Sequence, residues 1–278
     1  MLPRNEKILD QVRAEALRRD IPAAEVERWL GLARPSALLK QQGDGPVVGA
    51  IRGPVLLPAD AKDPTFPLIA TIDCAALPAD VTDLPLPADG HLLLFGWPEE
   101  DGYGQVMYVP AGVPVEEREQ YPPGFSPEDE ECAEVYAEIP EGDLHLTVDI
   151  SLPYVKTIPG PPWSPPLPGD PPFEELTKVW QDVLGDVPDG AFSYEGHTTP
   201  LLLGGYGTDC NGFNPAWLGA HRSGNSGEDG PPDHGDWVLL AEFHGGRQGG
   251  ATIYWVIRRA DLKERRFDQA SVLVYWNP

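Results

Sequence analysis

GATIYWVI (residues 250–257) is a glycine followed by a run of β-branched and aromatic residues, a pattern that favours a buried strand. GHLLLFGW (90–97) repeats the pattern earlier in the chain. Each string closes a series of three that occurs twice in the same order: RGPVLLP (52–58), LIATID (68–73) and GHLLLFGW, then LLLGGYG (201–207), LLAEFH (239–244) and GATIYWVI. Because the order is kept while the loops differ in length, the sequence predicts a duplicated β-rich unit.

Two further strings indicate strands outside this series. Apolar and polar residues alternate strictly over 144–152, so one face of that strand should be exposed to solvent. SVLVYW (271–276) has the composition of a strand. Residues 128–139 are ambiguous, because an acidic start suggests a helix while the later apolar residues alternate. We interpret this segment as a strand from Cys132 onward.

Helices are predicted at the N-terminus and in the middle of the chain. Apolar residues at helical spacing predict two helices within a helical segment 1–40, and a further stripe predicts a helix over 172–184. The remaining chain, 41–278, is predicted to be one α+β domain with antiparallel or mixed sheets. Its two related halves, 48–152 and 192–278, would be joined by a Pro-rich connection and the third helix.

Two long Pro- and Gly-rich segments are predicted to be loops. IPGPPWSPPLPGDPP (158–172) has eight prolines in its last fourteen residues and should run as polyproline II. It is either a rigid tether around a buried Trp163 or a Pro-rich recognition ligand. HRSGNSGEDGPPDHGD (221–236) has no large apolar residue, so it should be exposed, mobile or organised by something that it binds.

The chain resembles the YwqG-like bacterial proteins in the strings RGPVLLP, FPLIATID, LPADGHLLLFGW, LLLGGYG, WVLLAEFH and GGATIYWVIRRADLKERRF. The last string, 249–267, is the most specific, and the resemblance spans residues 48–276. It implies an α+β fold with two related β-rich halves, and it implies no activity, cofactor or catalytic residue. A Gln expected after the alanine of each copy is replaced by Thr71 and Glu242, and an Asp expected beside Gly249 is missing, so no role is carried over to these positions.

Acidic residues dominate the middle of the chain. The protein has 278 residues with 20 basic and 44 acidic side chains, and residues 63–246 alone hold 4 basic and 33 acidic ones. Such a field repels phosphate backbones and anionic lipid, which argues against a nucleic-acid or membrane-surface binder. The densest run, 116–143, has eleven acids and one arginine. Three interpretations are open: a solubilising surface, an anionic face for a cationic partner, or adaptation to salt.

Cysteine usage and hydropathy indicate a compartment. The first twenty residues lack the apolar region of a secretory signal, and no stretch approaches the roughly 18 apolar residues of a membrane span. The three cysteines, Cys74, Cys132 and Cys210, are odd in number and far apart, which suits free thiols in a reducing environment. The sequence predicts a cytoplasmic protein that binds no membrane.

Familiar catalytic and cofactor motifs are missing from the sequence. There is no P-loop string and no G-x-S-x-G elbow, and the glycines of LLLGGYGTDCNG favour a tight turn over a dinucleotide site. We therefore expect no cofactor and assign no catalytic residue.

One group of side chains remains as a candidate binding site. Its members are Asp209, Trp217, His221, His234, Asp236 and Trp237. The carboxylates and imidazoles, together with Cys210 and Asp233, have the donor atoms of a Zn²⁺ or Mn²⁺ site. Turn capping by Asp and burial of Trp explain the same residues without a ligand, and no metal is assigned.

Two functions are consistent with these observations. The first is a non-catalytic acidic binding module, inhibitor- or immunity-like, for a basic protein partner. The alternative is a small-molecule-binding protein or a metal-assisted hydrolytic enzyme with a cleft near the 209–236 loops. The acidic middle segment and the lack of a catalytic motif favour the first.

Overall fold

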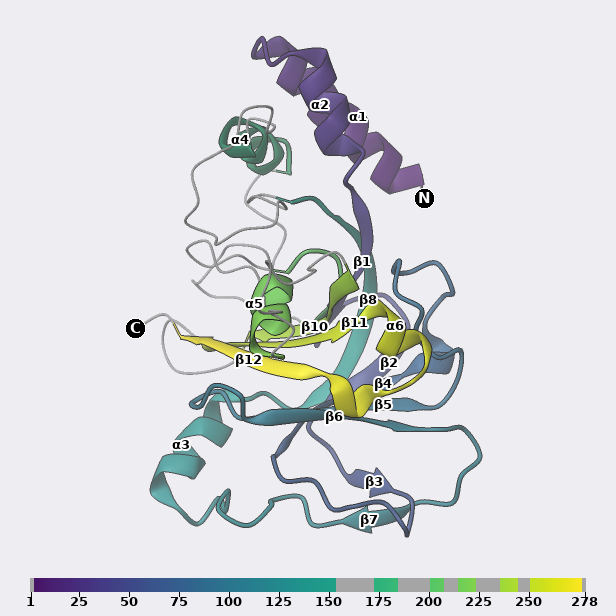
Figure 1. Cartoon of the computed structure of the whole chain (residues 1–278), viewed down its shortest axis with the longest axis vertical. Coiled ribbons are helices and arrows are strands. Elements are labelled where there is room, and N and C mark those ends of the chain that lie inside the picture. The colour runs from purple at the N-terminus through teal and green to yellow at the C-terminus, as the bar shows by residue number, and fades with distance from the viewer. Residues whose placement is uncertain are drawn as a thin grey trace, which may run out of the picture.

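Ten strands form one large sheet in the computed structural model, which describes residues 3–153, 173–184, 201–207, 215–223, 236–244 and 251–276 (Figure 1). The strands are β1 (Arg34–Lys40), β2 (Val47–Ile51), β4 (Leu68–Asp73), β5 (His91–Gly96), β6 (Gly104–Val109), β8 (Gly142–Ser151), β9 (Leu201–Gly204), β10 (Trp237–His244), β11 (Ala251–Arg258) and β12 (Ser271–Trp276). Their order is β12-β11-β10-β9-β1-β8-β2-β4-β5-β6, and every pairing is antiparallel. A separate ribbon pairs β3 (Val55–Leu57) with β7 (Glu116–Arg118). The expected α+β class is confirmed.

The sheet has two flanks on either side of a central pair, β1 and β8. We call β2, β4, β5 and β6 the first flank, and β9, β10, β11 and β12 the second flank. Both β4 and β10 contain a bulge, between Leu68 and Ala70 and between Leu239 and Ala241. These two alanines are the ones that LIATID and LLAEFH share, so these two strings occupy matching places in the two flanks, whereas RGPVLLP contains β3 of the separate ribbon and LLLGGYG contains β9 of the large sheet.

The main core lies inside the curl of this sheet, between the two flanks. The edge strands β6 and β12 approach each other, and the Val274 backbone N–H donates to Asp101 Oδ1 (3.0 Å) beside this seam. Across the interior, the Trp255 indole N–H donates to the Phe95 carbonyl oxygen over 2.9 Å. Trp255 and its neighbour Ile253 are fully buried in this core, which removes a large apolar surface from water, whereas the Phe95 side chain is buried in a separate cluster with Val55 and Leu57 of β3.

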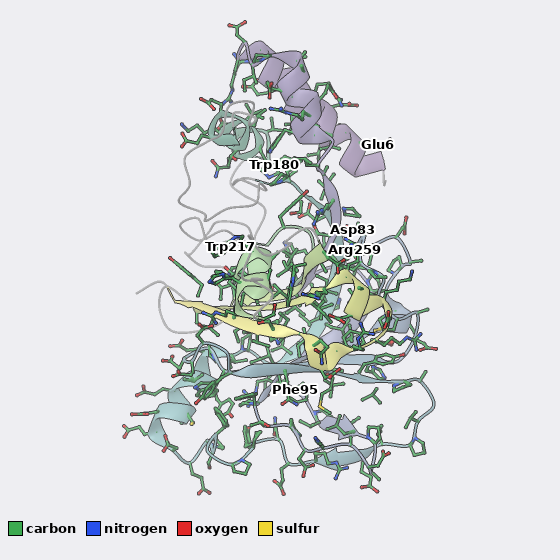
Figure 2. All side chains as sticks on the ribbon, in the orientation of Figure 1. Glu6, Asp83, Phe95, Trp180, Trp217 and Arg259 are labelled. Atoms are coloured by element: carbon green, nitrogen blue, oxygen red, sulfur yellow. The ribbon has the colours of Figure 1, made fainter. Side chains whose placement is uncertain are left out.

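Helices lie at three places around the sheet. They are α1 (Pro3–Arg18), α2 (Ala23–Leu30), α3 (Glu130–Glu138), α4 (Phe173–Leu184), α5 (Pro215–Arg222) and α6 (Arg259–Lys263). α1, α2 and α4 pack together at one end of the molecule, where the buried Trp29 donates to the Pro153 carbonyl oxygen (2.6 Å) and meets Trp180 edge-on (Figures 1 and 2). The predicted N-terminal helices and the helix near 172–184 are confirmed. None of the helices within the described ranges is long and apolar enough to cross a membrane.

The strand expected from Cys132 onward is wrong, because α3 occupies this segment. The Asp129 side chain accepts hydrogen bonds from the backbone N–H groups of Glu131 and Cys132, and thereby caps the helix start. The buried face consists of Cys132, Val135 and Tyr136, which have helical spacing. The alternating pattern was misleading, since Ala137, one of its members, is exposed.

The predicted helical segment 1–40 is too long, because its last part forms β1. α2 ends at Leu30, and Arg34–Lys40 lies between β8 and β9 in the centre of the sheet. Four successive residues of β1, 36–39, are buried, as expected of a strand covered on both faces. The Pro-rich segment 158–172 and most of the 221–236 loop lie outside the described residues.

Candidate functional site

The candidate site from the sequence is only partly within the described residues. Asp209 and His234 lie outside them, as do Cys210 and Asp233. Trp217 and His221 share α5 and stack with ring centroids 5.1 Å apart and planes 6° apart. Asp236 directly precedes β10 and is half-buried, while Trp237 begins that strand.

Trp237 lies in the apolar layer between α5 and the outer face of the second flank. A Cβ atom on Gly219 of α5 would come within 2.3 Å of Val256 Cγ2 and 3.1 Å of Trp237 Cε3, so the helix backbone rests directly on these side chains. Buried Trp237 therefore has a packing role beneath α5. In the part of the chain that the structure describes, no three His, Cys, Asp or Glu side chains gather to form a metal site.

Beside this layer, the second flank contains a polar relay of buried Glu242 and Thr252 with half-buried His244, which no sequence motif indicated. His244 Nε2 lies 2.6 Å from Glu242 Oε1, and His244 Nδ1 lies 3.0 Å from the Thr252 hydroxyl. β10 places Glu242 and His244 on one face, and Thr252 stands opposite His244 on β11. In the tautomer that carries its proton on Nε2, the Nε2–H donates to the Glu242 carboxylate and Nδ1 accepts a hydrogen bond from the Thr252 hydroxyl.

The relay satisfies a carboxylate that has no access to water. Glu242 is 0% exposed and Thr252 is 1% exposed, so neither group reaches solvent. A buried carboxylate costs several kcal/mol unless it is paired and hydrogen-bonded, and His244 supplies that partner. The order Thr–His–Glu resembles a nucleophile relay, yet a nucleophile must meet its substrate, and this hydroxyl is covered. The signal in the sequence was a lone Glu within the apolar string LLAEFH.

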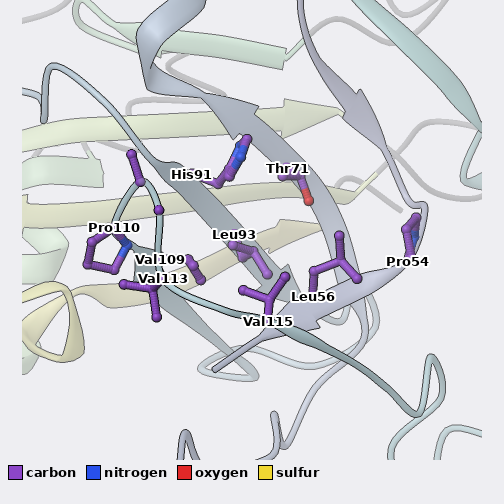
Figure 3. Close-up of a pocket in the computed structure, with 11 residues that line it drawn as sticks. Pro54, Leu56, Thr71, His91, Leu93, Val109, Pro110, Val113 and Val115 are labelled. Carbon is purple, nitrogen blue, oxygen red and sulfur yellow. The ribbon is translucent and has the colours of Figure 1, made fainter. Parts of the chain in front are cut away.

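The first flank has an apolar pocket on its outer face (Figure 3). The pocket has a volume of about 190 Å³ and is lined by Pro54, Leu56, Thr71, His91, Leu93, Val109, Pro110, Ala111, Gly112, Val113 and Val115. β4, β5 and β6 supply its floor, β3 supplies one wall, and residues 110–115 supply the other. Thr71 and His91 are its polar lining residues. The signal in the sequence was the apolar content of VPAGVPV (109–115), a segment between two predicted elements.

The acidic run 116–143 forms an exposed surface around β7 and α3, which we call the acidic lobe. All its acids except the half-buried Glu138 are exposed. Its one arginine, Arg118, donates to the carbonyl oxygens of Pro58 (2.8 Å) and Ala59 (3.0 Å). The basic group is therefore engaged by the backbone after β3. β7 and α3 lie at the end of the molecule away from α1 and α2 (Figure 1).

Several charges elsewhere form local pairs. In α1, Arg13 lies 2.5 Å from both Asp10 and Glu27, and at the edge of the sheet Arg259 pairs with Asp83 at 2.7 Å (Figure 2). The Arg259 guanidinium also donates to the Asp83 carbonyl oxygen, which fixes the loop after β4 to the start of α6. These pairs are structural, and the acidic lobe differs from them in its excess of acids.

The described cysteines lack the features of a nucleophile. Burial raises the pKa of the Cys74 thiol to about 12, with the charge of Asp73 adding to the effect. Burial also raises the pKa of Cys132. A reactive cysteine needs a lowered pKa, so both are core thiols.

No protein-family model matches the sequence, and a search of curated proteins finds no similar sequence.

Proposed function

We propose that this protein is a non-catalytic binding module whose acidic lobe recognises a basic protein partner. The observation that carries this proposal is the exposure of the acids of 116–143 together with the engagement of Arg118 by backbone carbonyl groups. A surface of one sign attracts a partner of the opposite sign, which raises the association rate and excludes acidic partners. Both cysteines within the described ranges, Cys74 and Cys132, are free thiols, which supports a reducing compartment, so we place this function in the cytoplasm.

The contrast with the opposite end of the molecule supports a role for the lobe. On α1 and α2, Arg13, Arg19 and Arg28 each pair with acids of the helical cluster, so that charge is locally balanced. A solubilising charge excess would serve equally well if it were distributed over both ends. In this chain the run 116–143 is the densest part of the excess, with eleven acids and one arginine, and this local density favours recognition.

Affinity capture at varied salt tests the proposal. The bait is the full chain, and the test variant is Glu128→Gln/Glu130→Gln/Glu131→Gln in the acidic lobe. The matched control, Glu6→Gln/Asp20→Asn/Asp44→Asn, removes the same charge from exposed acids elsewhere. We expect a protein of basic isoelectric point to be captured, to dissociate as salt rises, and to bind the test variant at least tenfold more weakly than the control. Capture of no basic protein, or affinity indifferent to salt, would overturn the proposal.

We also infer that the two flanks derive from one duplicated unit, and that the strings they carry justify the likeness to YwqG-like proteins. Support comes from the matching string order and the matching bulges in β4 and β10. By the strand register counted from these bulges, Thr71 corresponds to Glu242, and His91 corresponds to Thr252. The copies would then have diverged on their outer faces, one retaining a pocket and the other a buried relay.

A further inference from the structure

We propose that the pocket of the first flank holds one apolar side chain of the basic partner, and that acids at its rim bind the Lys or Arg residues on either side of that side chain. This inference rests on the proposed function and adds the anchor point. It makes the partner's recognition segment a short basic stretch that presents a single aliphatic or aromatic residue.

The pocket gathers apolar surface that is otherwise rare outside the core. Leu56, Val113 and Val115 line it and are 41%, 38% and 39% exposed. They are half of the six large hydrophobic residues that are exposed in the described ranges. Exposed apolar side chains that cluster around a concavity mark an interaction site, whereas single scattered ones are ordinary.

The size of the pocket indicates the size of its occupant. Sites for cofactors and drug-sized ligands usually occupy roughly 300–1,000 Å³. The volume of about 190 Å³ is below that range and suits a single large side chain. Interfaces between proteins obtain much of their affinity from such an anchor residue in a desolvated pocket.

Strand register places acids at two sides of the pocket. Leu56 stands opposite Glu117 in the ribbon of β3 and β7, so these side chains share a face. At the floor, His91 stands opposite Asp73, which places that carboxylate on the pocket face of β4. The apolar interior (Figure 3), together with the acids that the register places beside it, is complementary to an apolar residue flanked by basic ones.

Charge argues against a second copy of this chain as the occupant. A two-fold interface would bring each acidic patch against its own equivalent or close to it. Glu116 and Glu117 are both exposed next to the pocket wall, and the acidic lobe continues from them. Like charges held across such an interface are destabilising, whereas a basic partner neutralises them.

Selection from a displayed library of random peptides tests this inference on the intact protein. We expect enriched peptides to share one Leu, Ile, Met or aromatic residue flanked by Lys or Arg. A synthetic peptide of the enriched sequence is then titrated by fluorescence anisotropy, alongside versions with the apolar residue replaced by Gly or with the basic residues replaced by Gln. Both replacements should weaken binding by about tenfold or more.

Matched variants locate the peptide on the protein. Leu56→Ser and Val113→Ser each remove an apolar side chain from the pocket wall. The controls, Leu17→Ser and Val47→Ser, make the same changes at side chains elsewhere that are 44% and 48% exposed. We expect the pocket variants to weaken the peptide by about tenfold and the controls by less than twofold. Because all four side chains are substantially exposed, melting temperatures should stay close together, and either pocket variant alone suffices if the other is unstable.

The outcomes separate this inference from the function on which it rests. Basic peptides that need no apolar residue and bind the pocket variants normally would overturn the pocket but leave the acidic lobe as a binding surface. Failure to enrich any peptide, or enrichment of uncharged apolar peptides, would overturn the inference, while the capture experiment decides the function separately. A dimer in sedimentation analysis that Val113→Ser dissociates would also overturn it, in favour of self-association.

Discussion

The outer faces of the two flanks use matching strand positions for opposite purposes. On the first flank, Thr71 and His91 lie at an open pocket. On the second flank, the matching positions carry Glu242 and Thr252, which are buried in a hydrogen-bonded relay beside α5. The difference follows from what covers each face: a short ribbon and a loop leave a hollow, whereas a helix whose glycine rests on the sheet closes the surface. Polar side chains at these positions line the open pocket on the first flank and form buried hydrogen bonds on the second.

The largest expected effect concerns the core beneath the open flank, where Cys74 directly follows β4. With a pKa of about 12, roughly one Cys74 thiol in ten thousand is ionised at pH 8, against about a quarter of ordinary thiols. We expect iodoacetamide to alkylate Cys74 about a thousandfold more slowly in the native protein than in urea, as measured by mass spectrometry of its peptide. Equal rates would show that the reagent reaches the Cys74 thiol in the native protein, so that the core beneath the open flank is not closed.

Removing the relay histidine should destabilise the closed flank strongly. His244→Ala leaves the Glu242 carboxylate buried without this partner, which we expect to cost about 3 kcal/mol in the free energy of unfolding. The matched control is His91→Ala, which removes an exposed imidazole at the pocket and should change stability by less than about 0.5 kcal/mol. Urea titration of both variants checks the comparison, and equal losses would contradict the different roles of the two faces.

The close contact between α5 and the sheet tests whether this helix closes the second flank. Gly219→Ala would place a methyl group 2.3 Å from Val256 Cγ2, so the helix must move away from the sheet. We expect a loss of about 2 kcal/mol by thermal or urea unfolding. Gly43→Ala is the control, because its added Cβ would meet His145 Cβ at an ordinary 3.5 Å and should be close to neutral. A neutral Gly219→Ala variant would show that α5 is not tightly seated.

The smallest effect is expected at Glu138, an acid that lacks the kind of partner Glu242 has. Burial, reinforced by the charge of Glu99, raises the pKa of Glu138, and its buried Oε2 accepts no hydrogen bond from the residues described. Because the folded-state pKa is above the unfolded value, ionisation of Glu138 destabilises the fold at neutral pH, and this effect vanishes as pH falls below the unfolded value. We therefore expect Glu138→Gln to raise the melting temperature slightly at pH 7 and not at pH 4. A variant that is less stable at pH 7 would contradict this.

Local patterns were sufficient for most of the elements. The strands β5, β8, β11 and β12 and the helices α1, α2 and α4 were predicted because each has its own periodicity over several residues. α3 was missed because its apolar residues satisfy two periods at once, and its Asp129 cap was not weighed. β1 was missed because its strand character comes from neighbours far away in the sequence.

The sites could be predicted far less well than the elements. The pocket combines a wall from β3, a floor from β4 to β6 and the segment 110–115, and only the strand register brings these together. The relay depends on Glu242 and Thr252 facing the same way across β10 and β11, which is again a matter of register. Composition did indicate the acidic lobe, because a contiguous run of charged side chains stays together and largely exposed whatever fold the chain adopts.

The central pair of strands has a consequence for how the chain reaches its native state. β1 belongs to the N-terminal part but pairs with β8 and β9, and β8 in turn pairs with β2. Neither flank can therefore complete its sheet from its own segment, and a fragment ending before β8 would expose unpaired edges that invite aggregation. Pairings of such long sequence separation slow folding, and during synthesis β1 must wait for strands made much later. The sheet can therefore close only after β8 and β9 have been made, and the pairing of β1 with β8 joins the two flanks at that step.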